Sequence, residues 1–119
     1  MGTWGEGNFH NDSARDYLAS VIKHHIQTIE DCLGSEQKQK LINCGESKLM
    51  PSADILTLLC EAYNASLPVS EATVRDWKDS YLEIFDQQID SYKPEPSYKL
   101  KRRNTIEETF EILASLAEE

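Results

Sequence analysis

The histidines are the residues to weigh first, because imidazole is a frequent metal ligand and general base in proteins. His24 and His25 are neighbours in an amphipathic pattern, so on a helix their side chains would point about 100° apart. Two ligands of one metal ion on a helix need a spacing of three or four residues instead, and no carboxylate or thiol follows either histidine by four. His25 lies on the apolar side of the pattern, as a core or boundary imidazole would. We therefore predict no metal site and no cofactor.

Acid–base catalysis would need paired carboxylates, for which Asp12, Asp16 and Asp54 are the candidates. Each also has a structural explanation: Asp12 as a helix N-cap, Asp16 in the first turn, and Asp54 near the positive end of its own helix. No nucleophile motif such as Gly-x-Ser-x-Gly is present. Cys60 stands in the most apolar segment, where burial raises the pKa of a thiol and leaves it inert. We therefore favour a protein without catalytic residues.

The cysteines are odd in number and widely spaced, and they form no Cys-x-x-Cys motif: Cys32, Cys44 and Cys60. Disulfides are rare in reducing compartments. We therefore expect three reduced thiols in a cytoplasmic protein.

Five carboxylates recur at steps of three and four and are called the acidic stripe below: Asp76, Asp79, Glu83, Asp86 and Asp90. At about 100° per residue they lie on one side of a helix, opposite its apolar stripe. Arg75 is spaced to pair with Asp79, and Lys93 with Asp90. A basic run from Lys99 to Arg103 would neutralise the end of the stripe and leave most of it unpaired. The stripe is either a docking face for a basic partner or an ordinary solvated face.

The sequence predicts helices for the segments that position these residues. Apolar spacing predicts a helix from Asp12 to Leu33 that ends at Gly34, and a second from Ala53 to Tyr63 that follows Pro51 and is apolar nearly all round. A helix capped by Ser70 extends to about Tyr92. Other expected elements are a short helix over Glu36–Asn43, a loop through Gly45, and a last helix with a capping box formed by Thr105 and Glu108.

The predicted fold is all-α: one domain over residues 1–119, a compact bundle of four main helices plus a short one. The 119 residues carry a formal charge of −9, which opposes binding to nucleic acid or anionic lipid. No segment is apolar enough to cross a bilayer, and the start does not read as a signal peptide. We expect a cytoplasmic protein that binds neither nucleic acid nor membrane.

The first eleven residues predict a non-helical arm, since glycine permits close backbone approach and positive φ. Its aromatic side chains would dock on the helices. The opening has a recognisable pattern of residues, which we expect to be structural: Gly2, Trp4, Gly5, Gly7, Phe9, Asn11, Asp12 and Asp16. This pattern resembles the bacterial domain-of-unknown-function family 4259, whose members begin Met-Gly-x-Trp-Gly-x-Gly-x-Phe-x-Asn-Asp. The resemblance implies a helical fold and a bacterial cytosolic setting, but no activity.

Two functions from different classes remain. The leading hypothesis is a non-catalytic interaction module whose acidic stripe binds a basic protein, for example as an immunity protein that neutralises a toxin. The alternative is a small-ligand protein or enzyme with its site where the arm meets the helices, using Trp4 as a wall and Asn11, Asp12, Asp16 or Asp54 as polar groups. Homo-oligomerisation through apolar faces of the last two helices is a third possibility.

Overall fold

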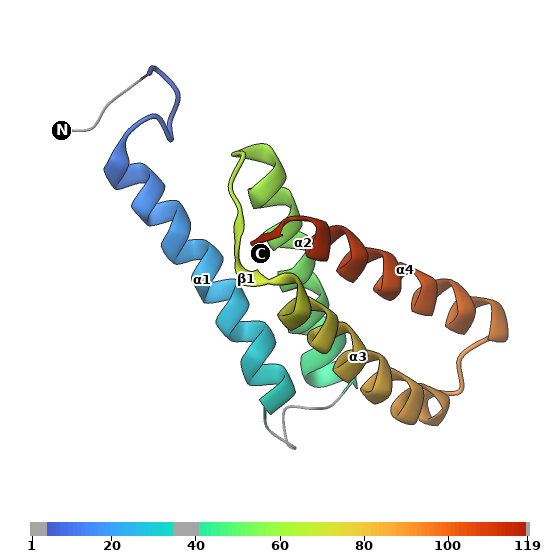
Figure 1. Cartoon of the computed structure of the whole chain (residues 1–119). Coiled ribbons are helices and arrows are strands. Elements are labelled where there is room, and N and C mark those ends of the chain that lie inside the picture. Colours follow the sequence, from blue (N-terminus) through green and yellow to red (C-terminus); the bar gives the residue numbers. More distant parts are fainter. Residues whose placement is uncertain (1–4, 35–40, 119) are drawn as a thin grey trace.

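Four α-helices form the body of the part of the chain that the structure describes (Figure 1). The structure is a computed structural model, and it describes residues 5–34 and 41–118. The elements in chain order are α1 (Asp12–Gly34), η1 (Leu41–Leu49), α2 (Met50–Ala62), β1 (Leu67–Ser70), α3 (Glu71–Gln88), η2 (Ile89–Tyr92), α4 (Pro96–Ser115) and β2 (Ala117–Glu118). The predicted all-α class is confirmed.

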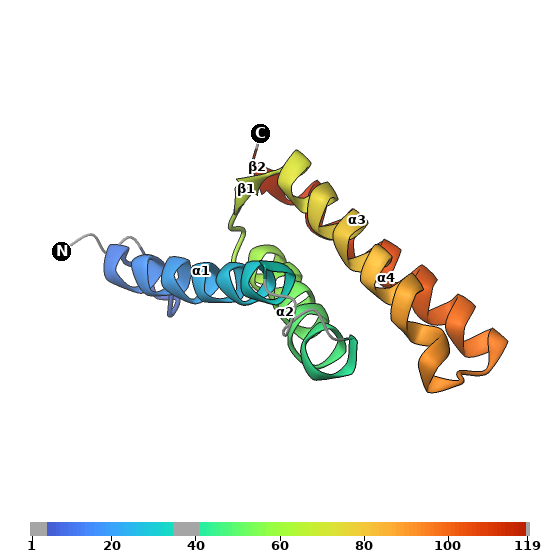
Figure 2. The same ribbon diagram turned by 90° about the horizontal axis from the view of Figure 1, so that it is seen from below.

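The helices pack mainly as two pairs, α1 with α2 and α3 with α4. Contacts of α2 with α4, and of α1 with α3, join the pairs around one apolar core. Figure 2, seen from below, shows the two pairs running in different directions from the region where they meet. The acidic stripe therefore lies on a different pair from the histidines and the first two cysteines.

The first helix has the predicted extent, but its N-cap is one residue earlier than expected. The side-chain Oδ1 of Asn11 accepts a hydrogen bond from the Ala14 amide at 2.8 Å, and its carbonyl accepts one from the Arg15 amide at 3.1 Å. Asp12 is instead the first residue of α1. The assignment of Asp12 as N-cap was wrong because an asparagine caps as well as an aspartate does.

Between α1 and α2 the chain is helical where the sequence indicated a loop. The expected helix over residues 36–43 falls largely outside the described residues, but Leu41–Leu49 forms the π-helix η1 and continues directly into α2. Gly45 is buried in η1 against the ring of Tyr81, so closely that any Cβ at this position would overlap the ring. Gly45 thus permits a close approach, and the expected loop through it is wrong.

Helix α2 is apolar nearly all round, yet it is not fully central. Met50, Leu56 and Cys60 are buried, whereas Leu58 remains 63% exposed and Ile55 38% exposed. A fully apolar sequence predicts burial on every side. Here α1, η1 and α4 cover only part of the circumference, so α2 keeps an exposed apolar edge.

Helix α3 follows the prediction most closely. The Ser70 hydroxyl accepts a hydrogen bond from the Thr73 amide at 3.1 Å, as an N-cap should. Its buried side chains follow the expected apolar stripe and include Trp77, Tyr81 and Phe85. After Gln88 the last predicted turn tightens into the 3₁₀-helix η2, and Lys93 then adopts φ 53° to end it.

Helix α4 begins at Pro96, well before the predicted capping box. Pro96 stands in the first turn, where its missing N–H costs nothing. The Thr105 hydroxyl donates to the Lys101 carbonyl within the helix instead of capping it. The capping box of Thr105 and Glu108 is therefore wrong, and the basic run from Lys99 to Arg103 is helical.

A short parallel strand pair, which the sequence did not indicate, joins the middle of the chain to residues 117–118. Leu67 pairs with Ala117, and the Leu67 amide donates to the Leu116 carbonyl at 3.0 Å. Leu67 is fully buried. The two strands lie beside the N-terminus of α3 (Figure 2), and they hold that end of α3 next to the C-terminus of α4.

Candidate functional site: the acidic stripe and its surroundings

The acidic stripe lies on the solvent side of α3 and its extension η2. Asp76, Asp79, Glu83, Asp86 and Asp90 are all exposed, while the apolar stripe of the same helix is buried. The opposed faces that helical spacing predicts are therefore present.

Helix α4 neutralises the C-terminal end of the stripe. Arg103 donates two hydrogen bonds to the Asp86 carboxylate, from Nε to Oδ1 and from Nη2 to Oδ2, each at 3.0 Å. Hydrogen bonds from Arg103 hold the pKa of the Asp86 carboxyl below its ordinary value. Lys99 Nζ lies 2.8 Å from Oδ1 of Asp90. Lys99 and Arg103 stand four residues apart on α4, and together they reach both of these acids.

The N-terminal part of the stripe has no such neutralisation. Among the described residues no lysine, arginine or histidine forms a salt bridge with Asp76, Asp79 or Glu83, and Glu83 accepts only a 3.4 Å hydrogen bond from the Gln87 amide. The unpaired carboxylates therefore lie along the middle of α3, from Asp76 to Glu83.

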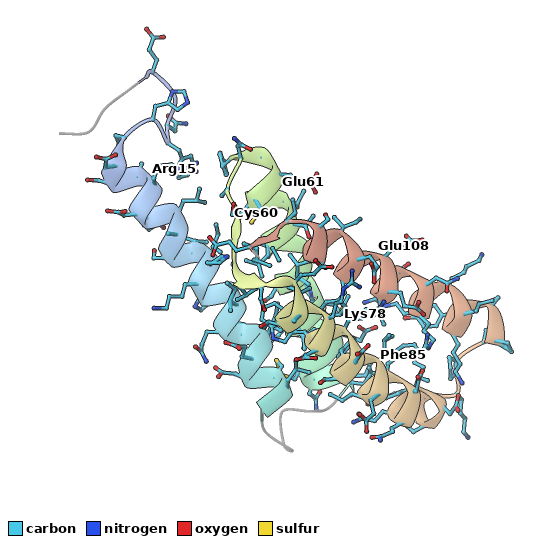
Figure 3. All side chains as sticks on the ribbon, viewed as in Figure 1. Arg15, Cys60, Glu61, Lys78, Phe85 and Glu108 are labelled. Carbon is cyan, nitrogen blue, oxygen red and sulfur yellow. A yellow bond between two sulfur atoms is a disulfide. The ribbon has the colours of Figure 1, made fainter. Side chains whose placement is uncertain are left out.

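The two ion pairs expected along the stripe do not form. Arg75 pairs with Glu71 at 2.8 Å and with Glu111 of α4 at 3.0 Å, not with Asp79. Asp90 pairs with Lys99 and not with Lys93, whose left-handed backbone ends η2. Lys78, labelled in Figure 3, also meets Glu111, at 2.7 Å. Ion pairs with Glu71 and with residues of α4 thus take the place of the two expected pairings.

A hollow of about 280 Å³ adjoins the unpaired part of the stripe. It lies between the end of α1 and the outer side of α3, and it is lined by Leu33, Ser80, Glu83, Ile84 and Gln87. Leu33 and Ile84 are partly buried and pack against the core. The surface beside Glu83 therefore combines a carboxylate with an apolar floor.

A half-buried charge network ties η1 to both helices of the second pair. Arg102 donates to the two carboxylate oxygens of Glu46 at 2.7 and 2.9 Å, and the Tyr81 hydroxyl donates to Oε2 of Glu46 at 2.7 Å. Burial acts to raise the pKa of Glu46, but hydrogen bonds from Arg102 and Tyr81 outweigh it and lower that pKa. Burial and the neighbouring carboxylate raise the pKa of Tyr81. We interpret this network as structural.

A larger hollow of about 550 Å³ lies in the other helix pair, among α1, η1 and α2. Cys32 and Cys44 line it and form a disulfide with Cα atoms 5.9 Å apart, a separation typical of such bonds. The expectation of three reduced thiols is therefore wrong for this pair, because α1 and η1 bring together cysteines that the sequence separates. Cys60 is a buried free thiol whose pKa is raised by burial, as predicted.

The two adjacent histidines line the same hollow. His25 is partly buried, and burial, together with the neighbouring His24, lowers its pKa. Within residues 5–34 and 41–118 no group of three or more His, Cys, Asp or Glu side chains is placed to hold a metal ion.

The cleft of the alternative hypothesis exists, but its expected polar groups are elsewhere. Where the described part of the arm meets α1 and α2, a hollow of about 330 Å³ is lined by Phe9, His10, Arg15 and Tyr63 among others. Asp12, Asp16 and Asp54 are not among its described lining residues, and Asn11 is occupied in capping. Asp54 instead lines a different hollow, together with Glu46 and Arg102. The structure does not bring the proposed carboxylates together.

The described part of the arm contacts the body through one aromatic pair. The Phe9 and Tyr63 rings have centroids 4.4 Å apart, and Arg15 donates to the Tyr63 carbonyl at 2.8 Å. No described glycine has positive φ; Gly5 and Gly7 instead lie against the exposed ring of His10, which would have to shift to admit a Cβ. Gly2 and Trp4 lie outside the described residues.

Several apolar side chains of the second pair remain exposed: Tyr92, Tyr98, Leu100 and Ile112. Homo-oligomerisation through these helices stays a prediction that a molar-mass measurement would decide. No helix of the described residues is long and apolar enough to cross a membrane.

One comparison with known proteins identifies the family of this chain. The family model described as a domain of unknown function (DUF4259) matches residues 2–118. The chain therefore belongs to this family. Comparison with curated proteins and with solved structures found no match.

Proposed function

We propose that this protein is a non-catalytic interaction module that binds a basic protein on the acidic stripe of α3. The observation that supports it most is the uneven charge along the stripe. Asp86 and Asp90 are paired with α4, whereas Asp76, Asp79 and Glu83 are exposed and have no cationic partner among the described residues. A partner's lysines and arginines would supply the missing charges, and the net charge of −9 would steer it into contact.

The hollow beside Glu83 favours a protein over a simple cation. A lysine or arginine side chain of the partner would lay its aliphatic stem on Leu33 and Ile84 and direct its charged end to Glu83. Such a contact combines apolar burial with a charge-assisted hydrogen bond, which a solvated ion does not. An immunity-like role is the narrower form of this proposal, in which the bound basic protein is a toxin held inactive.

The test is charge reversal with a matched control. Proteins retained by the immobilised chain at low salt and released at high salt are identified, and the affinity of one basic protein is measured. The stripe variant carries Asp76→Lys, Asp79→Lys and Glu83→Lys. The control carries Glu30→Lys, Glu61→Lys and Glu108→Lys, which are also exposed (Glu61 and Glu108 are labelled in Figure 3). Three reversals of two charges each move both variants from −9 to −3.

We expect the stripe variant to lose about tenfold or more in affinity and the control much less, since nearby charges act more strongly than distant screened ones. Equal losses in the two variants would show an effect of net charge alone and would overturn the proposed surface. Retention of affinity by the stripe variant would overturn it as well.

A further inference from the structure

The hollow among α1, η1 and α2 has a disulfide in its wall. Its volume of about 550 Å³ lies within the range of small-molecule sites, roughly 300–1,000 Å³. Cys32 and Cys44 are only 3% and 5% exposed, and both line the hollow. A reagent small enough to enter the hollow would approach the sulfur atoms from there, whereas the surrounding core would exclude a protein-sized one.

The polar groups around this disulfide suit a small anionic thiol. Lys48 contributes an ammonium group, His24 and His25 contribute imidazoles, and Asp31 is the single carboxylate among the described lining residues. Thr28, Asn43, Ser47 and Ser52 add hydroxyl and amide groups. In a chain of charge −9, this wall offers an anion one ammonium group and several hydrogen-bonding groups.

We propose that this hollow is a reaction site for low-molecular-weight thiols of the glutathione class, which reduce the Cys32–Cys44 disulfide by exchange. The thiol loses its proton to an imidazole of the hollow, and its sulfur attacks one cysteine sulfur. A mixed disulfide forms, the Cys32–Cys44 bond breaks, and the other cysteine leaves as a thiolate that takes up the proton. A second thiol molecule attacks the mixed disulfide. The protein gains two electrons and two protons, and the two small thiols are oxidised to their disulfide.

His25 and Lys48 have separate roles in this step. Burial and the neighbouring His24 lower the pKa of His25, so its imidazole is neutral near pH 7 and available as a proton acceptor. Lys48 attracts the carboxylates of an anionic thiol. This division predicts that Lys48 affects an anionic thiol and not an uncharged one.

The test follows reduction of the oxidised full-length chain under anaerobic conditions. Samples are quenched by alkylation, and mass spectrometry detects the glutathione adduct and the newly freed cysteines. We expect an adduct on Cys32 or Cys44, followed by two free thiols. Ser47→Trp would fill the hollow and slow reduction by both glutathione and 2-mercaptoethanol by about tenfold, because exchange depends on access to the sulfur. The matched control is Ser20→Trp, an exposed position of α1 that does not line the hollow.

Lys48→Met should slow reduction of the disulfide by glutathione about threefold or more and leave the rate with 2-mercaptoethanol unchanged. The control Lys23→Met should change neither rate. Equal rates in Ser47→Trp and Ser20→Trp would overturn the proposal, as would reduction only at denaturant concentrations that unfold the chain. Three free thiols in protein treated with oxidised glutathione would overturn it too. A Ser47→Trp variant that is merely destabilised would be reduced faster, so lost stability cannot imitate the expected result.

Discussion

The two helix pairs are held together by different means. Ion pairs on the solvent side link α3 to α4, such as Arg103 with Asp86 and Lys78 with Glu111. Among the described residues the α1–α2 pair has no comparable network of ion pairs and relies on apolar packing. The Cys32–Cys44 disulfide joins α1 to the neighbouring η1 beside a hollow. Exposed ion pairs add little stability but fix which charges remain available. We infer that the second pair presents a charge pattern and the first pair presents a cavity.

The contact between the pairs offers the largest expected effect. Arg102→Met would leave the Glu46 carboxylate, whose side chain is 17% exposed, without its cation, and should lower the free energy of unfolding by about 2–4 kcal/mol. Adding Glu46→Gln removes the charge and keeps an acceptor for the Tyr81 hydroxyl, so most of the loss should be recovered. Urea unfolding of both variants measures this. A double variant as unstable as Arg102→Met would show that packing, not charge, holds the contact.

The close approach of η1 to α3 is tested at its glycine. Gly45→Ala places a Cβ against the buried Tyr81 ring, and the forced shift should cost about 1–3 kcal/mol in unfolding free energy. Gly34→Ala is the matched control, since a Cβ there meets nothing within 4 Å. Thermal unfolding should show Gly45→Ala less stable and Gly34→Ala unchanged or slightly more stable. Similar results for the two alanines would contradict the packing argument.

The Glu46 network also predicts a pH dependence. The folded-state pKa of Glu46 lies below its ordinary value of 4.5. Its contribution to stability is therefore complete above about pH 4.5 and is lost as the pH falls through the folded-state pKa. Urea midpoints between pH 7 and pH 3 should fall less steeply for Glu46→Gln with Arg102→Met than for the natural chain. Parallel slopes would assign the acid sensitivity to other carboxylates.

The smallest effect is expected along the outside of the α3–α4 pair. A double-mutant cycle of Arg103→Ala and Asp86→Ala should give a coupling energy of about 0–1 kcal/mol, and added salt should reduce it. Chemical denaturation at low and high salt measures both. A coupling of several kcal/mol would mean that the ion pairs between α3 and α4 stabilise this helix pair and do more than fix its charge pattern.

The sequence predicted the helices whose apolar spacing is long and regular, and it failed where tertiary contact decides. Helix α3 and its cap at Ser70 follow from local pattern alone. Gly45 indicated a loop, yet η1 passes through it with the ring of Tyr81 packed against it. The strand pair has too few residues to leave an alternating pattern.

The surroundings of the candidate site were predictable only in part. Helical spacing correctly placed the acidic stripe outside. The basic run was expected to neutralise the end of the stripe, and Arg103 and Lys99 do so by pairing with Asp86 and Asp90. Arg102 stands four residues before the buried Ile106, on the apolar side of α4, and this register was a signal for an inward-facing charge. The partners of Cys32 and Glu46 depended on the path of η1, which no local pattern specified.

The pairing of β1 with β2 has a consequence for synthesis on the ribosome. Leu67 is made 50 residues before its partner Ala117, which follows only after the whole of α3 and α4. Until then the backbone groups of β1 have no strand partner among the described residues. The strand pairing that positions the N-terminus of α3 therefore forms only when nearly all of this chain has emerged. The unpaired carboxylates of the acidic stripe lie toward this end of α3.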